Sequence, residues 1–447
     1  MIGILKKKFG YGQIIVFGYM FIILFGGLLL SLPVSSKTGE WTSYLNSVFT
    51  ATSATCVTGL VVYDTYTHWS VFGQIIIMIL IQIGGLGFMT IIALFSLFLK
   101  KNIGLYERKL LMQSAGSIKI GGVIRLIRRV ALGTLIVEGT GMILLATSFV
   151  PKMGWAEGLF NALFHSVSAF CNAGFDIMGK YGQFSSITGF QNDVVVNVTI
   201  MVLIVVGGIG FIVWNDVITQ KWHFKKYQLH SKIALVATII LIFGGAILFL
   251  LYENNAAFAD LNIGEKIMAA FFQSITPRTA GFNSVEMSEL SESGHLLTII
   301  LMFIGGSPGS TAGGIKTTTF VVVLLGAIAS ARHYTHINAF KKRLDESIVK
   351  EASAITTLYI VMIMISTLVI CSIQPFSMKD VLFEVVSAIG TVGLTAGITT
   401  SLGSISKIII ILLMFAGRVG GLTLALVLAE KKTNVILDRP VEKILIG

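Results

Sequence analysis

Eight stretches of this chain are strongly apolar, and all but the sixth are long enough to cross a bilayer as a helix. A helix needs roughly 20 apolar residues to cross the hydrocarbon layer. Only 12% of the 447 residues are charged, about half the share found in a soluble globular domain. The sequence therefore predicts an all-α membrane protein. The stretches span residues 14–32, 71–99, 130–150, 194–214, 233–252, 296–304, 354–373 and 408–428.

The positive charges predict which side of the membrane each connection faces. A net charge of +11 could suggest nucleic acid as a partner, but Lys and Arg gather at the N-terminus and in every second connection. Such segments stay on the cytoplasmic side, which places both termini in the cytoplasm and requires an even number of crossings. Eight crossings fit a multi-pass protein of the cell membrane. The basic segments are residues 6–8, 100–129, 221–232, 332–350 and 431–443.

The three lysines before the first apolar stretch are also typical of a signal peptide. No small-x-small cleavage site follows closely, so we predict an uncleaved first span.

A short motif recurs four times, with a period of one pair of apolar stretches. Each copy begins with Phe and ends with Gly followed by a large apolar residue, and the copies cover residues 49–60, 164–175, 272–282 and 383–394. A second glycine-rich motif follows in each unit, at residues 83–87, 206–210, 304–309 and 416–420. Two motifs in fixed order predict four tandem units of span, pore helix, glycine loop and span (M1-P-M2). We place the units at residues 1–108, 109–226, 227–343 and 344–447, with eight transmembrane helices and four re-entrant pore helices around one pore.

The first motif predicts a selectivity filter. Irregular backbone at membrane depth survives only where protein or water buries it, and four converging loops can present rings of carbonyl oxygens to an alkali cation. Glycine is required because such carbonyls face the axis only if the backbone visits positive φ. An ordinary connection ending in a glycine cap remains the alternative for any single copy. The predicted filter residues, whose carbonyls would hold K⁺, are Thr58, Gly59, Asn172, Ala173, Gly174, Thr279, Ala280, Gly281, Thr391, Val392 and Gly393.

The third copy of the second motif predicts a gate. Five glycines and a proline fall within ten residues in the middle of an expected span, which no continuous helix tolerates. Arg418 occupies the same column in the fourth unit, and an arginine at membrane depth is a functional candidate. Pairing of Arg418 with Glu138 is the alternative, and close helix packing is the interpretation of the first two glycine-rich copies. The predicted gate comprises Gly305, Gly306, Ser307, Pro308, Gly309, Ser310, Thr311, Ala312, Gly313, Gly314 and Arg418.

Other polar groups near these motifs are interpreted as structural. We expect Arg278 to point behind the filter and bind backbone, Lys316 to extend to the cytoplasmic interface, and His165 to be a structural residue of a pore helix. No nucleophile with its base, phosphate-binding loop or Cys/His metal pattern is present in the sequence, so catalysis is not predicted.

These motifs together resemble the Trk/Ktr/HKT superfamily of potassium uptake proteins, most closely the bacterial Ktr membrane subunits of the KtrB or KtrD type. The resemblance covers essentially the whole chain. It is carried by Thr-Gly-Leu at 58–60, Asn-Ala-Gly-Phe at 172–175, Pro-Arg-Thr-Ala-Gly-Phe-Asn at 277–283, Gly-Thr-Val-Gly-Leu at 390–394, the glycine-rich break and Arg418. All four filter positions are Gly, whereas sodium-selective plant relatives replace the first with Ser, so the resemblance implies potassium as the transported ion, with a sodium-coupled or mixed role left open.

The resemblance also implies a homodimer, with one pore per protomer, docked on a ring of soluble nucleotide-binding regulatory subunits. The basic segments 100–129 and 341–350 are the available docking surfaces, with lipid headgroup contact as their alternative. No cofactor bound by this chain and no nucleic-acid partner are predicted. An alternating-access secondary transporter for Na⁺ or another small cation remains the alternative function; a membrane scaffold would leave the glycine loops unexplained.

Overall fold

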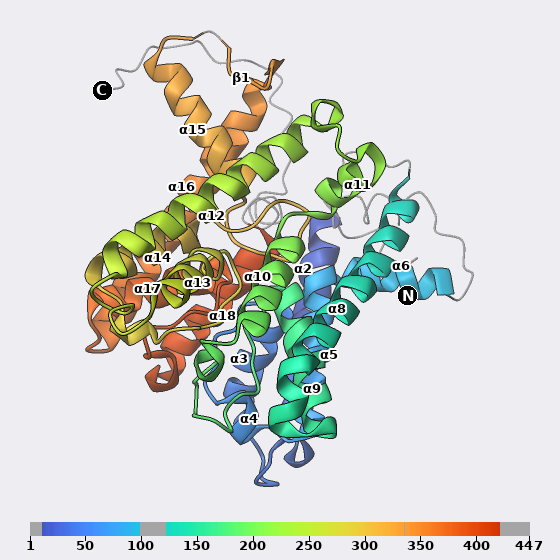
Figure 1. Ribbon diagram of the computed structural model, residues 1–447, viewed down its shortest axis with the longest axis vertical. Coiled ribbons are helices and arrows are strands. Elements are labelled where there is room, and N and C mark those ends of the chain that lie inside the picture. The colour runs from blue at the N-terminus through green and yellow to red at the C-terminus, as the bar shows by residue number, and fades with distance from the viewer. Residues whose placement is uncertain (1–10, 99–121, 335, 421–447) are drawn as a thin grey trace.

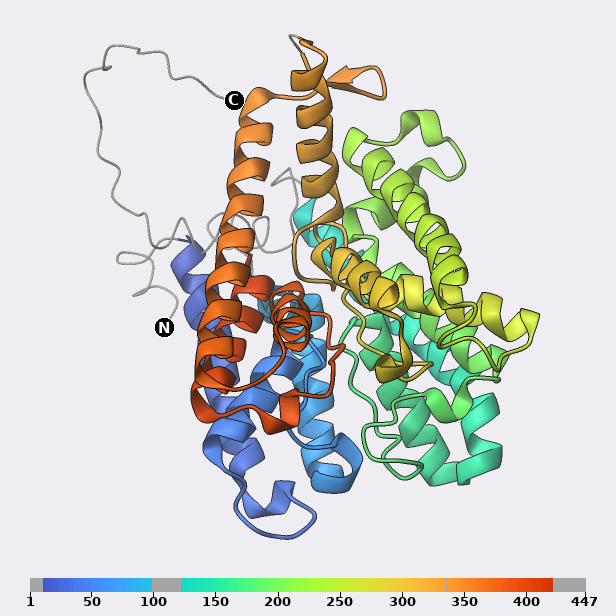
Figure 2. The same ribbon diagram turned by 90° about the vertical axis from the view of Figure 1, so that its left-hand side faces the viewer.

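A computed structural model describes residues 11–98, 122–334 and 336–420 of the chain, and these residues are predominantly helical. Three of the basic segments lie wholly or mostly outside the described residues: 6–8, 431–443 and 100–129. The one two-stranded antiparallel hairpin among these residues pairs Asn338 with Arg343 and Ala339 with Lys342. Together with helix α15 (Thr317–Ala331) the hairpin projects from one end of the molecule, and helix α4 (Thr65–His68) lies at the opposite end (Figures 1 and 2).

The first two units follow the same order of helices. In each, a first helix leads into a shorter buried helix, an irregular segment and then a helix that breaks. The first unit contains α2 (Tyr11–Ser31), η1 (Pro33–Ser35), α3 (Tyr44–Thr55), α4, α5 (Val71–Leu86) and α6 (Phe88–Phe98). The second contains α8 (Val123–Met153), α9 (Trp155–Phe170), η2 (Thr188–Phe190), α10 (Val194–Gly208), α11 (Phe211–Gln220) and η3 (Phe224–Lys226).

The third and fourth units repeat this order. The third contains α12 (Leu229–Glu253), α13 (Ile263–Ile275), η4 (Met287–Glu289), α14 (Glu292–Phe303), α15 and strands β1 (Asn338–Ala339) and β2 (Lys342–Arg343). The fourth contains α16 (Glu346–Ile373), α17 (Met378–Gly390), η5 (Thr399–Ser401) and α18 (Ser404–Val419). The predicted boundary at 226/227 falls between η3 and α12, that at 343/344 falls between β2 and α16, and that at 108/109 lies outside the described residues.

The four shorter helices α3, α9, α13 and α17 carry the first motif. They run for 12 to 16 residues, about 18–24 Å at the rise of an α-helix, so none is long enough to cross a bilayer. Side-chain caps fix where two of them begin, because Asn262 and Ser377 accept a hydrogen bond from a backbone N–H of the first turn. The phenylalanine that opens each motif is at most 1% exposed, which fixes the rotation of each helix: Phe49, Phe164, Phe272 and Phe383.

Four described helices are long and apolar enough to span a membrane: α2, α8, α12 and α16. Helices α10 and α11 form a fifth candidate if the pair, bent by 94°, counts as one span. Helices α5, α14 and α15 are apolar but shorter. The coarse prediction of a helical membrane protein therefore agrees with the described residues, and the number of eight crossings stays a prediction.

In every unit the helix that follows the filter segment ends at the glycine-rich motif: α5, α10, α14 and α18. Gly84 and Gly207 approach the carbonyl oxygens of Thr55 and Phe170 so closely that no side chain would fit, which agrees with the packing interpretation of the first two copies. That interpretation is nevertheless incomplete, because α5 and α10 both stop there. Gly87 and Gly210 adopt φ of 80° and 101°, and a new helix begins at the next residue.

A buried carboxylate joins the end of α12 to the start of α14. Glu253 is 0% exposed and accepts hydrogen bonds from the Ser291 backbone N–H, at 3.1 and 3.2 Å, and from the Ser291 hydroxyl at 2.6 Å. This contact sets where α14, and the break that follows it, begin.

We expect Glu253→Ala to lower stability by about 2 kcal/mol, because hydrogen bonds to a charged group contribute about 1.5–3 kcal/mol and the Ser291 N–H would lose its acceptor. Thermal unfolding in detergent measures the loss. Glu286→Ala is the matched control, since Glu286 is exposed and makes no side-chain cap to η4. Equal melting temperatures for the two variants would contradict this role of Glu253.

Candidate functional site

The four predicted filter glycines meet in one closed ring. The space next to each glycine, where a side chain would stand, is filled by the backbone of the next unit. A Cβ built on Gly59 would lie 3.2 Å from the Cα of Gly174, one on Gly174 2.9 Å from Gly281, one on Gly281 3.1 Å from Gly393, and one on Gly393 2.9 Å from Gly59. The order 59, 174, 281, 393 and back to 59 places the four units around a common centre.

The backbone conformation of the ring repeats in all four units. Each glycine has positive φ, between 65° and 95°, as the sequence predicted. The residue two positions earlier also has positive φ although it carries a side chain, and this was not predicted: Val57 (55°), Asn172 (57°), Thr279 (67°) and Thr391 (50°). Such conformations cost about 1–2 kcal/mol per residue and persist where the surrounding structure enforces them. Changes in the sign of φ turn neighbouring peptide groups, so that successive carbonyls can face one axis.

A column of hydroxyl groups supports the ring from the pore helices, and the sequence analysis missed it. The hydroxyl four residues after each motif phenylalanine bonds to the backbone of its own filter segment. Ser53 and Ser387 accept from the N–H of Gly59 (3.0 Å) and Gly393 (3.1 Å), whereas Ser168 and Thr276 donate to the carbonyls of Phe175 (2.6 Å) and Phe282 (2.7 Å). A signal was visible, because Ser or Thr holds this position in all four copies.

The ends of the four pore helices lie at this ring. Helices α3, α9, α13 and α17 end three to six residues before their glycine, so the carbonyl end of each helix, which carries partial negative charge, is next to the filter segment. Among the described residues, the buried hydroxyls of Thr58 and Thr391 have no hydrogen-bond partner. The ring therefore concentrates oxygen atoms and negative potential at one place, which suits a cation.

The residues of the predicted gate form a loop that contacts the filter segments of the third and fourth units. Helix α14 stops at Phe303, Ile304 pairs with Ile315 in an isolated parallel bridge, and α15 begins at Thr317. The loop between them is packed against two filter segments. A Cβ on Gly305 would lie 3.3 Å from Thr279, and one on Gly314 would lie 2.9 Å from the carbonyl oxygen of Gly390.

Hydrogen bonds join this loop to the second glycine-rich motif of two other units. Ser307 N–H donates to the Gly208 carbonyl (2.9 Å) and Thr311 N–H to that of Gly207 (3.3 Å). Gly314 N–H donates to the Gly417 carbonyl (3.2 Å). The loop is thus held by the broken ends of α10 and α18.

Arg418 of the fourth unit connects the loop to the first unit as well. Its guanidinium donates to the carbonyls of Thr311 in the loop and of Gly84, and to that of Gly85 at 3.2 Å. The ion pairs found among the described residues do not include Arg418. Glu138, the alternative partner, instead lies near Gln82 (3.3 Å) and Cys171 (3.9 Å). Arg418 is therefore bound by loop and helix-end carbonyls.

Two other expectations about charged residues need correction or refinement. Lys316 does not extend to the cytoplasmic interface as expected. Its Nζ donates a hydrogen bond to the Ala312 carbonyl at 2.6 Å, because the loop carbonyls are acceptors that lie nearer than the interface. Arg278 does point behind the filter, but it donates to the Thr238 hydroxyl on α12 at 3.2 Å where a backbone carbonyl was expected. His165 is buried against Phe149 and Phe282 and bonds to the Asn161 carbonyl, as a structural residue would.

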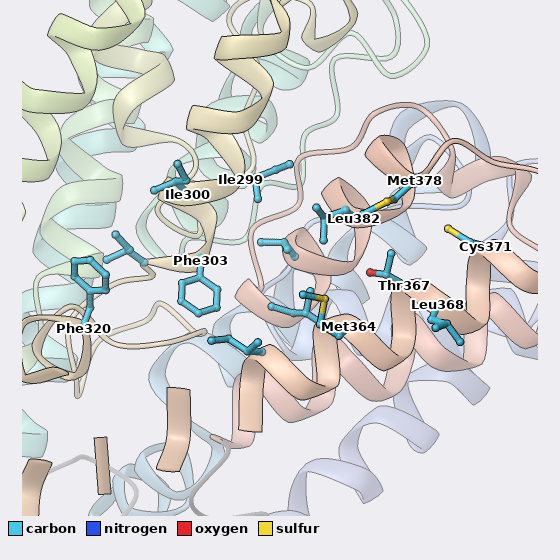
Figure 3. Close-up of a pocket in the computed structure, with 14 residues that line it drawn as sticks. Ile299, Ile300, Phe303, Phe320, Met364, Thr367, Leu368, Cys371, Met378 and Leu382 are labelled. Carbon is cyan, nitrogen blue, oxygen red and sulfur yellow. The ribbon is translucent and has the colours of Figure 1, made fainter. Parts of the chain in front are cut away.

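Two cavities differ in their relation to the ring. One of about 210 Å³ lies beyond the gate loop, and its lining includes Ser310, Lys316 and Arg418. Another of about 680 Å³ lies between α14, α15, α16 and α17 and is lined almost wholly by apolar side chains, with Thr367 and Cys371 as exceptions (Figure 3). Thr367 supplies the one side-chain oxygen in the lining of the second cavity, which therefore does not suit a cation. Within the described ranges, no group of three His, Cys, Asp or Glu residues is placed to hold a metal ion.

The model of the cation transport protein family TrkH matches residues 18–435. The chain belongs to this family. It is 40% identical over 449 residues to the potassium/sodium uptake protein NtpJ of Enterococcus hirae, covering 99% of this chain and 98% of that protein. It is 41% identical over 433 residues to the Ktr system potassium uptake protein B of Bacillus subtilis, covering 96% and 95%. Both relatives are named as uptake proteins, one for potassium and sodium and the other for potassium.

The fold is also similar to that of a solved member of the family. The crystal structure of the potassium transporter TrkH from Vibrio parahaemolyticus matches 95% of this chain and 86% of its own, with a TM-score of 0.72 and 18% sequence identity. At this level of identity the likeness concerns the fold alone.

We expect Gly174→Ala to destabilise the protein strongly. The new Cβ would lie 2.5 Å from the Ala280 carbonyl oxygen, and the residue would remain at positive φ. Gly139→Ala, in the middle of α8 with no atom within 4 Å of its Cβ position, is the control and gains about 1 kcal/mol of helix propensity. Size-exclusion profiles and melting temperatures in detergent compare the two. A Gly174→Ala protein as stable as the parent would rule out the closed ring.

Proposed function

We propose that this chain is the ion-translocating membrane subunit of a potassium uptake system, with a channel-like pore along the axis of the four-unit ring. The observation that carries the proposal is the closed ring of Gly59, Gly174, Gly281 and Gly393 with a loop directly beneath it. Carbonyl rings of this kind can replace the hydration shell of an alkali cation. The Ktr system and NtpJ relatives, named for potassium or potassium and sodium uptake, support the choice of ion.

Potassium is the main ion in this proposal, and sodium a second candidate. Glycine at all four filter positions leaves the ring free of side chains, and the name of NtpJ includes both ions. The transported ion is the cargo of the protein, and no resident cofactor is proposed for this chain.

The second proposal is that residues 305–314 and Arg418 form the gate. The loop contacts filter residues on one side and lines a cavity with Arg418 on the other. A fixed positive charge beneath a cation filter raises the electrostatic barrier, while the hydrogen bonds of Arg418 to Thr311 and Gly85 hold the loop closed. Alternating access is less well supported, because the ring and the loop form a fixed filter and a separate barrier, and the four units repeat in one direction.

The membrane arrangement and the partners complete the proposal. Eight crossings, four re-entrant loops and cytoplasmic termini in the cell membrane fit the position of the basic segments. The names of the Ktr system relatives support a separate regulatory subunit, for which we propose a cytoplasmic nucleotide-binding ring, and a homodimer is proposed with it. The described parts of the basic docking surfaces are residues 122–129, at the start of α8, and residues 341–350, which include the exposed strand β2 and the start of α16.

Gly59→Ser should weaken discrimination between potassium and sodium. A side chain at this ring position would push the neighbouring Ala173 carbonyl, which lies 2.5 Å from the Cβ position, out of register. Competition of sodium with rubidium uptake in proteoliposomes measures the effect. Gly39→Ser is the matched control, because Gly39 also has positive φ, 72°, but nothing lies within 4 Å of its Cβ position. Unchanged ion competition in Gly59→Ser would count against the filter.

Opening the gate should raise flux without loss of selectivity. Deleting residues 310–313 removes loop contacts beneath the ring, and Arg418→Gln removes the charge and most of the carbonyl bonds. Rubidium flux per folded molecule is the measurement, and Arg332→Gln, an exposed arginine at the end of α15, is the control. If both gate variants transport at or below the parental rate per folded molecule, the loop and Arg418 are structural and the gate is refuted.

A further inference from the structure

The residue directly after each motif phenylalanine is polar in all four units, and only one of these four side chains has a described hydrogen bond to a residue outside its own pore helix. Thr50 bonds to the Asn46 carbonyl one turn earlier (3.1 Å), and His165 bonds to Asn161 in the same way (2.8 Å). Gln273 has no hydrogen-bond partner for either atom of its amide among the described residues. The fourth residue in this column, Glu384, is 1% exposed and behaves differently.

Glu384 binds the segment that follows the fourth filter glycine. Its Oε2 accepts from the Thr395 hydroxyl at 2.8 Å, and its Oε1 accepts from the Thr399 hydroxyl. The two hydroxyl oxygens lie 2.9 Å apart, and Thr395 also accepts from the Gly397 N–H at 2.9 Å. One carboxylate thus gathers residues 395–399, which begin two positions after Gly393.

The first three units hold this outer side in another way, through hydrogen bonds between units. Phe184 N–H of the second unit donates to Asp64 of the first (3.0 Å). Ile187 N–H donates to the Asn283 carbonyl of the third unit (3.2 Å), and Asn283 N–H donates to Ser186 (3.1 Å). The hydrogen bonds described for residues 394–400 stay within the fourth unit. The outer end of the fourth filter segment therefore depends on Glu384.

The carboxylate is suited to this task. Its two oxygens can accept from both hydroxyls at once, and the ion pairs among the described residues do not involve Glu384. Its hydrogen-bond partners are the neutral hydroxyls of Thr395 and Thr399. On the inner side the same segment is fixed by Ser387, which accepts from Gly393 N–H. The fourth segment is thus held from both ends by side chains of α17.

We propose that Glu384 is a positioning residue for the fourth filter segment, and that the discrimination between potassium and sodium depends on its two bonds to Thr395 and Thr399. This inference rests on the proposed filter function. A carbonyl ring that is held open cannot contract around the smaller sodium ion, whereas a ring with one loose segment can. Loosening residues 395–399 frees Gly393, whose backbone abuts Gly59 and so closes the ring.

The test compares sodium competition with rubidium uptake in proteoliposomes of full-length variants. Glu384→Ala, and the milder Thr395→Val and Thr399→Val, should each lower the preference for rubidium over sodium several-fold. Adding both threonine changes to Glu384→Ala should cause little further loss, because the shared partner is already gone. Gln273→Met is the matched control at the same column position, and it should keep parental selectivity.

A conservative variant separates positioning from charge. Glu384→Gln keeps the length of the side chain and can exchange hydrogen bonds with both hydroxyls, so it should retain most of the selectivity. A Glu384→Gln protein as unselective as Glu384→Ala would overturn the positioning role and leave the charge itself as the cause. Should Glu384→Ala fail to fold, parental selectivity in Thr395→Val and Thr399→Val would overturn the proposal. If Gly59→Ser also leaves selectivity unchanged, the filter itself is wrong; if Gly59→Ser alters it, only the inference fails.

Discussion

The structure depends on the close contact of four backbone segments around one axis. Each glycine of the ring is packed so tightly against the next that no Cβ would fit without displacing backbone, so the contact is made by peptide groups and not by side chains. Peptide groups at membrane depth need partners, because no water is available in the hydrocarbon layer. The pore helices and their hydroxyl column supply these partners on one side. On the other side, within the ring, we propose that carbonyls remain available to an ion.

The broken helices beneath the ring follow from the same constraint. Helices α5, α10, α14 and α18 all end at their glycine-rich motif, which leaves helix-end carbonyls close to one another. Arg418 and the loop N–H groups bind these carbonyls. The contact between loop and filter is direct, since the Asn172 side chain lies 3.3 Å from the Thr311 hydroxyl. The loop of the third unit and the filter segment of the second unit are therefore in direct contact.

The sequence predicted the repeated part of this arrangement better than the local part. Four copies of one motif imply four equivalent positions, so the spacing predicted the glycine ring, and the need for carbonyls to face one axis predicted its positive φ. The hydroxyl column at Ser53 and its equivalents was visible but was not used. The breaks at Gly87 and Gly210 were missed, because Gly-Gly pairs also suit packing within a continuous helix. The partners of Arg418 and Lys316 could not be predicted, since both residues bind carbonyls placed by the path of a loop, and a carbonyl carries no signature in the sequence.

The most direct test of the account is to locate the ion. Rubidium or thallium scatters X-rays anomalously, so crystals of the protein grown in either ion would mark the binding positions. The account predicts anomalous peaks on the axis of the ring that Gly59, Gly174, Gly281 and Gly393 form. These peaks should lie close to the carbonyl ends of the four pore helices. Peaks confined to the cavity beside Lys316 and Arg418, or an empty ring in a well-ordered crystal, would contradict it.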